Sequence, residues 1–450
     1  MSLSKALAGF IVQTSYPDLP EEVVSFTKLC ILDWLGSALA GADKPPIAMI
    51  DGLVKEWGGA GQATLVTGGK SSIAHAALVN GAASHVVELD DIHKSSIIHA
   101  ATVVIPAAVA VAETLHKSGA DLIAAVAIGY DVCFRIGEAV SPSHYRYWHN
   151  TATCGTFGAA AATAKLLELN EEQIVHALGN AGTQAAGLWE FIEDGAMSKQ
   201  LHTGKAAMNG LLASCLAQKG FTGPSKILEG ERGFFSSMSE NPDASRITYR
   251  LGQVYKIVEN SFKIHASCRH THPAVDLVLQ MVQKHGVTKE KIARLRVGGY
   301  QSVLAITDNP NPDTVYAAKF SAQFCVAMAL VRGRAGLTDF TEEALWDPEI
   351  HAWLEKVELS LDPEVDRAYP EKWGSTLEIL TTEGKTIRFA TEYPKGDPEN
   401  PVTAEELAMK FHQLAGHIDE TRRKAWVLQL LNLEHLSDTA DFWSERSYVS

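Results

Sequence analysis

The chain has 450 residues, of which 46% are hydrophobic and 20% charged, and its formal net charge is −14. A chain of this length is too long to fold around a single hydrophobic core, so two domains are expected. The acidic balance argues against a nucleic-acid or anionic-membrane partner. Scattered cysteines without a CxxC pair, no signal-peptide pattern and no uninterrupted apolar run of membrane-spanning length together predict a cytoplasmic protein.

The first 270 residues predict one helix after another. Pro20, followed by Glu21 and Glu22, is typical of a helix start. Many of the expected helices are rich in Ala and Gly, and small residues let helix axes approach closely. A compact helical bundle domain is therefore predicted over 1–270, with helices at 20–42, 72–89, 102–116, 119–139, 154–168, 171–186, 198–218 and 240–252.

The pattern changes after about residue 270. The stretches 291–298 and 356–361 alternate as half-buried strands do, and 376–391 reads as two strands joined at Glu383-Gly384. With a helix at about 317–331, this predicts a smaller α+β lid domain over 271–400. The tail 401–450 is helical again and is expected to pack on the bundle, with the lid as the alternative. The fold class is mainly α.

Motifs for metals and cofactors are weak. The stretch TGGKSS at 67–72 lacks the first glycine of a phosphate-binding loop, because Thr64 stands there. His270 and His272 form an HxH pair, but no further ligand set with zinc spacing accompanies them. The sequence therefore predicts no metal and no organic cofactor.

Four short segments are rich in histidine and other polar residues. In the first, His85, Glu88 and Asp91 follow each other at i,i+3 spacing, which on a helix gives one shared face. In the second, Tyr145 and His149 stand just before an Ala-rich helix, where a helix N-terminus favours anions. The alternative for any single histidine is a core or surface residue without a functional role.

The third and fourth segments add positive charge. Lys199, His202 and Lys205 line one helical stripe, and they repel each other unless an anion or carboxylates offset them. A basic solvent-exposed face is the alternative. The fourth segment, NSFKIHASCRHTHPAVDL, contains Lys263, His265, Cys268, Arg269, His270 and His272.

These four segments resemble the motifs of the MmgE/PrpD family. The first resembles its NGxxxH…DD…H segment, and the second its His before a TxxxGxFGAAAAAAKLL helix. The third and fourth resemble its KxLHxGxAAxxG and K…CxxTH stretches. The residues that carry the resemblance are Asn80, Gly81, His85, Asp90, Asp91, His99, His149, 155–167, 199–210, Lys263, Cys268, Thr271 and His272.

The resemblance implies an all-α bundle with a smaller α+β lid, a homodimer, and chemistry without metal or organic cofactor. The family's activities include 2-methylcitrate dehydration, cis-aconitate decarboxylation and iminodisuccinate epimerisation. The chain departs from the family pattern at Glu88, at Ile92-His93 and after His99. Within the family it looks most like an iminodisuccinate epimerase, with a dehydratase or decarboxylase as the alternative.

The expected reaction moves a proton at a carbon next to a carboxylate of a small di- or tricarboxylic acid. The resulting dianion needs fixed positive charge, and a base must take the proton. The predicted catalytic residues are His149 as the base, Tyr145 or His99 as the opposing acid, and Lys199 as the charge stabiliser. The predicted substrate-binding residues are Glu88, Asp91, His93, His202, Lys263, Cys268, Arg269 and His272. A carboxylate-binding protein without catalysis is the alternative from another class.

Overall fold

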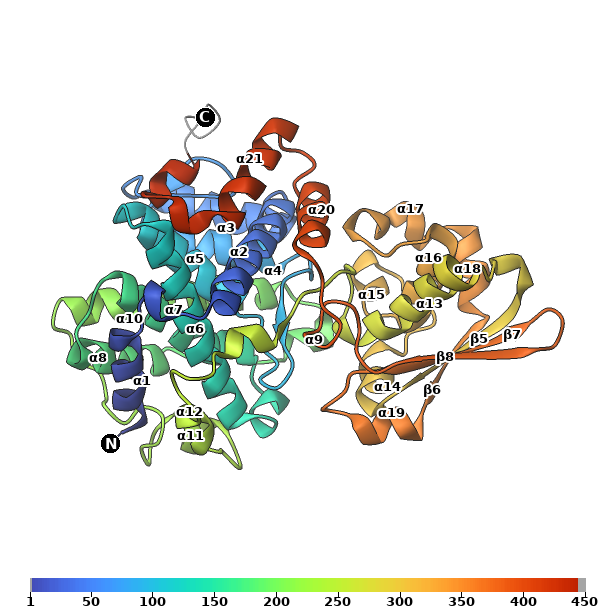
Figure 1. The fold of residues 1–450 in the computed structure, drawn as a ribbon, viewed down its shortest axis with the longest axis horizontal. Coiled ribbons are helices and arrows are strands. Elements are labelled where there is room, and N and C mark those ends of the chain that lie inside the picture. Colours follow the sequence, from blue (N-terminus) through green and yellow to red (C-terminus); the bar gives the residue numbers. More distant parts are fainter. Residues whose placement is uncertain (1, 444–450) are drawn as a thin grey trace. The chain divides into compact units, whose positions relative to one another are not determined.

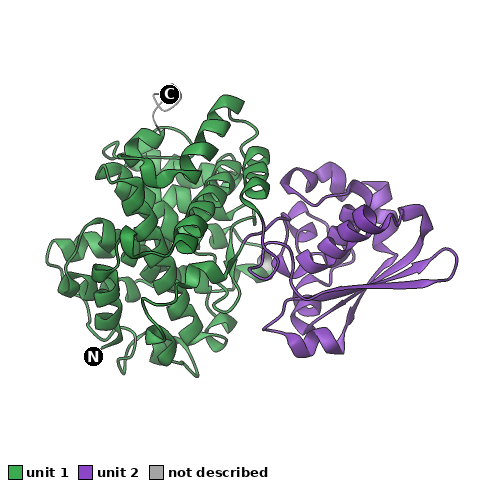
Figure 2. Cartoon of the chain, viewed as in Figure 1, with its two compact units in different colours: residues 1–261, 403–450 green, residues 262–402 purple. Residues whose placement is uncertain are grey.

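The computed structural model describes residues 2–443, apart from the side chain of Asp194. The chain is mainly helical, with 59% of its residues in helices and 9% in strands, as predicted. It divides into two compact units, residues 1–261 with 403–450 and residues 262–402 (Figure 2).

Unit 1 is a helical bundle (Figure 1). Its helices are α1 (Leu3–Gln13), α2 (Glu21–Gly41), α3 (Pro45–Trp57), α4 (Ile73–His85), α5 (Ala101–Thr114), α6 (Gly119–Val140), α7 (Asn150–Leu166), α8 (Glu171–Gly182), α9 (Phe191–Asp194), α10 (Ser198–Gln218), α11 (Phe234–Met238), α12 (Ser245–Thr248), α20 (Ala404–Leu414) and α21 (Glu420–Leu431). Two short antiparallel pairs join β1 (Ala63–Thr64) to β2 (Lys70–Ser71) and β3 (Ile92–His93) to β4 (Asn260–Ser261).

Small residues bring α4, α7 and α10 close together at the centre of unit 1. A Cβ atom at Gly204 of α10 would lie 2.2 Å from the carbonyl oxygen of Leu78 in α4. A Cβ atom at Gly210 would lie 2.5 Å from the carbonyl oxygen of Thr156 in α7. Any larger side chain at these positions would push the helices apart. This packing confirms that the Ala- and Gly-rich helices form a compact core, and it brings three of the four histidine-rich segments together.

Helix α2 is long and apolar enough, by length and composition alone, to cross a membrane. Most of its apolar window is buried inside the protein, against α4, α20 and α21. The side chains of Lys28 and Asp33 in α2 form ion pairs with Glu434 and Lys410 in the C-terminal segment. These features are those of a core helix of the bundle.

Some predicted helix ends are wrong. The helix expected at 72–89 ends at His85, so His85, Glu88 and Asp91 do not share a helical face. The helix expected to start at 154 begins at Asn150, directly after His149. The helix expected over 240–252 is reduced to Ser245–Thr248 followed by turns.

Unit 2 is built on a four-stranded sheet with the order β6-β5-β7-β8. Strand β5 (Ile292–Gly299) pairs in parallel with β6 (Val357–Leu361) and antiparallel with β7 (Ser375–Thr381), which pairs antiparallel with β8 (Thr386–Thr391). The helices of this unit are α13 (His272–His285), α14 (Gln301–Thr307), α15 (Val315–Ala318), α16 (Ala322–Arg332), α17 (Glu342–Leu345), α18 (Pro348–Leu354) and α19 (Pro363–Ala368). Helix α13 packs on β7, β8 and α16.

Candidate active site

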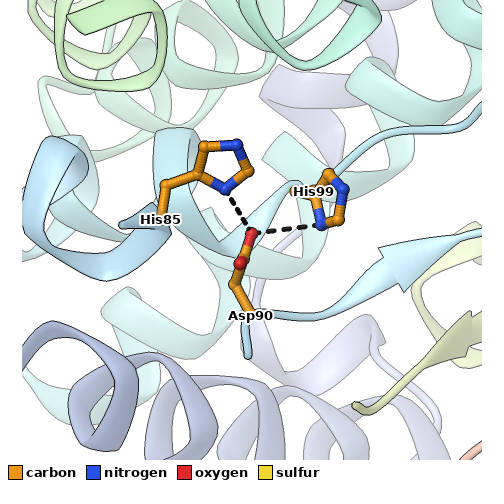
Figure 3. Close-up of side chains that lie close together, drawn as sticks. All are labelled: His85, Asp90 and His99. Atoms are coloured by element: carbon orange, nitrogen blue, oxygen red, sulfur yellow. Dashed lines mark hydrogen bonds and ion pairs between the residues drawn. The ribbon is translucent and has the colours of Figure 1, made fainter. Parts of the chain in front are cut away.

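The loop after α4 holds two histidines on one carboxylate. Nδ1 of His85, the last residue of α4, lies 2.7 Å from Oδ2 of Asp90. Nδ1 of His99 lies 3.1 Å from the same oxygen and 2.5 Å from the carbonyl oxygen of Asp91. Figure 3 shows both rings turned toward the Asp90 carboxylate. We call His85, Asp90 and His99 the His–Asp cluster.

The hydrogen bonds of the His–Asp cluster fix its protonation. Burial alone would raise the pKa of Asp90, but the two adjacent imidazoles and their hydrogen bonds hold that pKa well below its usual value. An ionised carboxylate accepts hydrogen bonds, so each Nδ1 carries a hydrogen and Nε2 is the basic position of each ring. The Asp90 charge also stabilises an imidazolium on a ring that takes up a second proton.

His149 lies at the N-terminus of α7, fully enclosed by aromatic rings. Its backbone N–H donates to the carbonyl oxygen of Gly187 at 2.9 Å. Its ring centroid lies 5.7 Å from that of His85, nearly parallel, and 5.0 Å from that of Trp189. Burial first, then the nearby His85 and Lys199, lower the pKa of His149 well below its usual value. His149 is therefore a neutral imidazole at neutral pH, the form that a general base requires.

Lys199, in the first turn of α10, forms an ion pair with Glu88, and both side chains are buried. Glu88 adopts a left-handed backbone conformation with φ of 60°. A non-glycine residue in this region is strained, and such a conformation persists only where contacts with the surrounding structure hold it in place. The Glu88 carboxylate is thereby directed at the Lys199 ammonium, which places a fixed cation near His149.

Two further predicted residues lie beside His149. Nδ1 of His202, one turn after Lys199 on α10, lies 3.4 Å from Nδ1 of His149. Burial and the charges of His85 and nearby lysines lower the pKa of His202 to about 4. Tyr145 lies in a 3-10 turn (Ser143–Arg146) with its ring edge against Trp189, at 5.0 Å between centroids. The predicted segments around 85–99, 145–149 and 199–202 thus meet within unit 1.

Asp91 forms a separate hydrogen-bonded group in unit 1. It accepts hydrogen bonds from the Tyr130 hydroxyl at 2.7 Å and the Asn260 amide at 2.6 Å. Burial outweighs these bonds and raises the pKa of Asp91 to about 7. This group connects the loop after α4 to α6 and to β4.

The ring of His93 contacts an aromatic ring, a hydroxyl group and a carboxylate of unit 1. Its ring stacks on Phe134 at 4.1 Å, and its Nδ1 lies 2.8 Å from the Ser96 hydroxyl. Its Nε2 faces Glu259 at 3.5 Å. These contacts hold both residues in the loop, and the predicted substrate-binding roles of Asp91 and His93 stay predictions.

The fourth predicted segment lies in unit 2, in the loop before α13 and in its first residue. Arg269 forms a buried ion pair with Asp397, and its guanidinium also donates to Nδ1 of His272 at 3.0 Å. Nε2 of His272 donates to the carbonyl oxygen of Ser267 at 3.2 Å. Cys268 and Lys263 are buried in the same loop. Their substrate-binding roles remain predictions as well.

Two groups of side chains have metal-ligand atoms close together, the His–Asp cluster and a set formed by His93, Glu138 and Glu259. In the His–Asp cluster the nitrogen-to-oxygen distances are those of hydrogen bonds, so the Nδ1 hydrogens occupy the space between the ligand atoms. In the second set the Lys256 ammonium lies 3.0 Å from both glutamates and supplies the positive charge. Both sets are therefore complete without an ion.

The sequence analysis missed His85 and Asp90 as site residues, although both belong to the recognised NGxxxH…DD motif. Their five-residue separation carried a signal, because a helix that ends at His85 lets the chain turn back and bring Asp90 to its ring. The apolar residues Val86, Val87 and Leu89 instead prolonged the helical pattern.

The geometry provides two kinds of imidazole within one site. His149 is held neutral, whereas the rings of His85 and His99 lie against an ionised carboxylate. Groups whose surroundings favour opposite protonation states can serve as base and acid in the same reaction. The buried Lys199 ammonium, paired with Glu88, lies near His149 in the same site.

Comparison with known proteins supports the resemblance seen in the motifs. The MmgE/PrpD N-terminal domain matches residues 5–247, and the MmgE/PrpD C-terminal domain matches residues 265–434. A cis-aconitate decarboxylase of Aspergillus terreus is 29% identical over 450 residues, covering 94% of this chain and 91% of that protein. The cis-aconitate decarboxylase of Homo sapiens is 26% identical, covering 97% and 93%. A mitochondrial 2-methylcitrate dehydratase of Yarrowia lipolytica is 25% identical, covering 60% and 55%.

Proposed function

The chain belongs to the MmgE/PrpD family, and on that premise we propose that it is a lyase for a small di- or tricarboxylic acid, with cis-aconitate as the first candidate substrate. Cis-aconitate decarboxylases match nearly the whole chain, whereas the 2-methylcitrate dehydratases match 53% to 60% of it. The observation that carries the proposal is the neutral His149 beside a His–Asp cluster able to hold a proton.

Decarboxylation and dehydration make similar demands on this site. In decarboxylation the carbon–carbon bond to the leaving CO2 breaks, and its electron pair becomes a carbanion delocalised next to a remaining carboxylate. An acid then forms the new C–H bond. In dehydration a base removes a proton from such a carbon, and an acid protonates the leaving hydroxyl group. Both routes place negative charge next to a carboxylate, where a fixed cation lowers the barrier.

We assign the acid, which both routes require, to His99, and the base, which only the dehydration requires, to His149. The Asp90 carboxylate favours a proton on the rings that contact it, which suits His99 to donate from Nε2. Lys199, fixed by Glu88, is assigned to the developing negative charge. Tyr145 is the second candidate for the acid, as its ring lies against the same Trp189 that contacts His149.

The cis-aconitate decarboxylases and 2-methylcitrate dehydratases among the relatives favour a lyase over the epimerase predicted from the motifs. Epimerisation would use the same base and acid on opposite faces of one carbon, so it remains an alternative reaction for the same site. The predicted homodimer is also kept as a proposal, to be tested by light scattering on the purified protein.

One experiment separates these reactions. The purified protein is incubated in deuterated water with cis-aconitate, 2-methylcitrate or iminodisuccinate, and each mixture is followed by proton NMR. A decarboxylase releases CO2 and leaves one deuterium in the product, whereas a dehydratase forms an unsaturated acid without losing carbon. An epimerase exchanges the α-hydrogen and changes only the stereochemistry.

The lyase proposal fails if cis-aconitate and 2-methylcitrate both remain unchanged. No exchange with any of the three acids would favour a binding protein instead. His417→Asn serves as the control variant, because His417 is an exposed histidine of unit 1 far along the chain from the three segments.

A further inference from the structure

His85 lies between the two histidines assigned to catalysis. Its ring is nearly parallel to that of His149 at 5.7 Å and meets the edge of the His99 ring at 5.1 Å. It is completely buried, and its Nε2 has no hydrogen-bond partner among residues 2–443. A buried ring nitrogen without a partner is costly, and in a native structure it requires an explanation.

The His–Asp cluster can balance one positive charge. His85 and His99 approach the same oxygen of Asp90, and the other oxygen has no hydrogen-bond partner within the described chain. An imidazolium on either ring is neutralised by the carboxylate. A second imidazolium would face the first at a ring separation of about 5 Å, and like charges at this distance oppose each other.

Other charged and titratable groups surround this arrangement. His149 faces His85 from the start of α7, and His202 and Lys199 face it from α10. Asp91 lies next to Asp90 but is tied to Tyr130 and Asn260. The negative charge of Glu88 is matched by Lys199. The Asp90 carboxylate is therefore the charge that His85 and His99 share.

We propose that His85 is a positioning residue that shares one proton with His99 through the Asp90 carboxylate, and that its stacked ring keeps His149 unprotonated. The role of His85 in turnover rests on the proposed function, but the shared proton is a property of the folded protein itself. His85 thus couples the acid and the base of the site: a proton on the His–Asp cluster disfavours a proton on His149.

The test is a histidine titration by NMR on the full-length protein labelled with ¹³C at the histidine Cε1. The variant is His85→Asn, whose side-chain amide can still donate to Asp90 but cannot take up a proton. We expect His149 to remain neutral in the wild-type protein down to the lowest pH at which it stays folded. In His85→Asn the His149 signal should titrate at a higher pH than in the wild-type protein, because a nearby like charge has been removed.

His144→Asn is the matched control, because His144 is a buried histidine of the same unit whose ring nitrogens contact the Met238 carbonyl oxygen and the Thr153 hydroxyl. It should leave the His149 titration unchanged. A folded His85→Asn protein with unaltered titration of His149 and His99 would overturn the proposal. If this variant does not fold, the wild-type signals decide: His85 and His99 should titrate as one coupled pair, and two independent single-step curves would contradict the shared proton.

The titration needs no substrate, so its outcome is independent of whether the chain is a lyase. Where activity is found, kcat/KM gives a second measurement. Both limbs of its pH profile should move to higher pH in His85→Asn. The Asp90 carboxylate then interacts with His99 alone, and His149 is no longer repelled by a charge on His85. A residue with a purely structural role would lower kcat without moving either limb.

Discussion

Each unit of the molecule contains a group of buried histidines, and the two groups differ in what their ring nitrogens contact. In unit 2 both nitrogens of His272 have partners, the Arg269 guanidinium and the Ser267 carbonyl oxygen. In unit 1 Nε2 of His85 has no hydrogen-bond partner among residues 2–443, and His149 faces another imidazole. A saturated imidazole stabilises a fold, whereas an incompletely paired one is available for proton transfer.

The two units also contain one buried ion pair each near these histidines, Lys199 with Glu88 and Arg269 with Asp397. Arg269 is further tied to backbone carbonyl oxygens of Phe262 and Lys395. Glu88, in the other pair, has a strained backbone conformation with a positive φ. We therefore expect chemistry in unit 1 and a structural role for the Arg269 group, and variants in each unit can test these expectations.

The largest effect is expected for Lys199→Ala, which removes the ion-pair partner of the buried Glu88 carboxylate. We expect a loss of about 3–5 kcal/mol in unfolding free energy, together with a higher KM and a lower kcat. The double variant Lys199→Met/Glu88→Gln removes both charges and should regain stability but not activity. Denaturant unfolding beside steady-state kinetics measures both quantities. Full activity in the stable double variant would remove Lys199 from the reaction.

His149→Asn tests the base in unit 1. For a reaction that removes a proton, such as dehydration or epimerisation, we expect kcat to fall by about 10²-fold or more, the usual cost of losing a general base, with a smaller change in KM. His417→Asn should leave both constants unchanged, and melting temperatures show whether each variant is folded. A folded His149→Asn protein with near wild-type kcat would leave His99 or His202 as the candidate base.

His272→Asn is the counterpart in unit 2. It removes at least one hydrogen bond to a fixed partner, so we expect a loss of about 1–3 kcal/mol in stability with kcat within about threefold of wild type. Thermal unfolding and kinetics on the same preparation provide the comparison. A raised KM without loss of stability would instead support the substrate-binding role that the motif predicts.

The smallest effect concerns Asp91, whose pKa is raised by burial to about 7. The folded protein takes up a proton here between pH 8 and 6, whereas the unfolded chain, with an ordinary carboxyl, does not. Stability from this group is therefore lost as pH rises through 7, by about 1.4 kcal/mol between pH 6 and pH 8. Asp91→Asn should flatten this slope in denaturant titrations at several pH values. An unchanged slope would show that Asp91 stays ionised in the folded protein.

The sequence predicted the helical bundle, the strands of the smaller α+β unit and the place of His149 before a helix, because periodicity and an Ala-rich helix after a polar loop are local signals. It did not predict the contact between His85 and Asp90, which depends on how the chain turns after α4. Glu88 has a positive φ without being glycine, so nothing in its residue type marked the turn. Apolar residues on both sides of it extended the helical pattern instead. Cross-chain contacts of this kind follow from tertiary packing, which outweighs local propensity.

Lys410 of α20 has a consequence for how the site is made in the cell. Its ammonium donates to Asp33 at 2.6 Å and to the carbonyl oxygen of Leu89 at 2.7 Å, next to Asp90. The peptide that carries the His–Asp cluster is thus fastened by a residue 321 positions later in the chain. During synthesis, the whole stretch from Leu89 to α20 is made before this contact can form. A nascent chain arrested ahead of α20 would carry every histidine of the site and still lack the anchor that completes it.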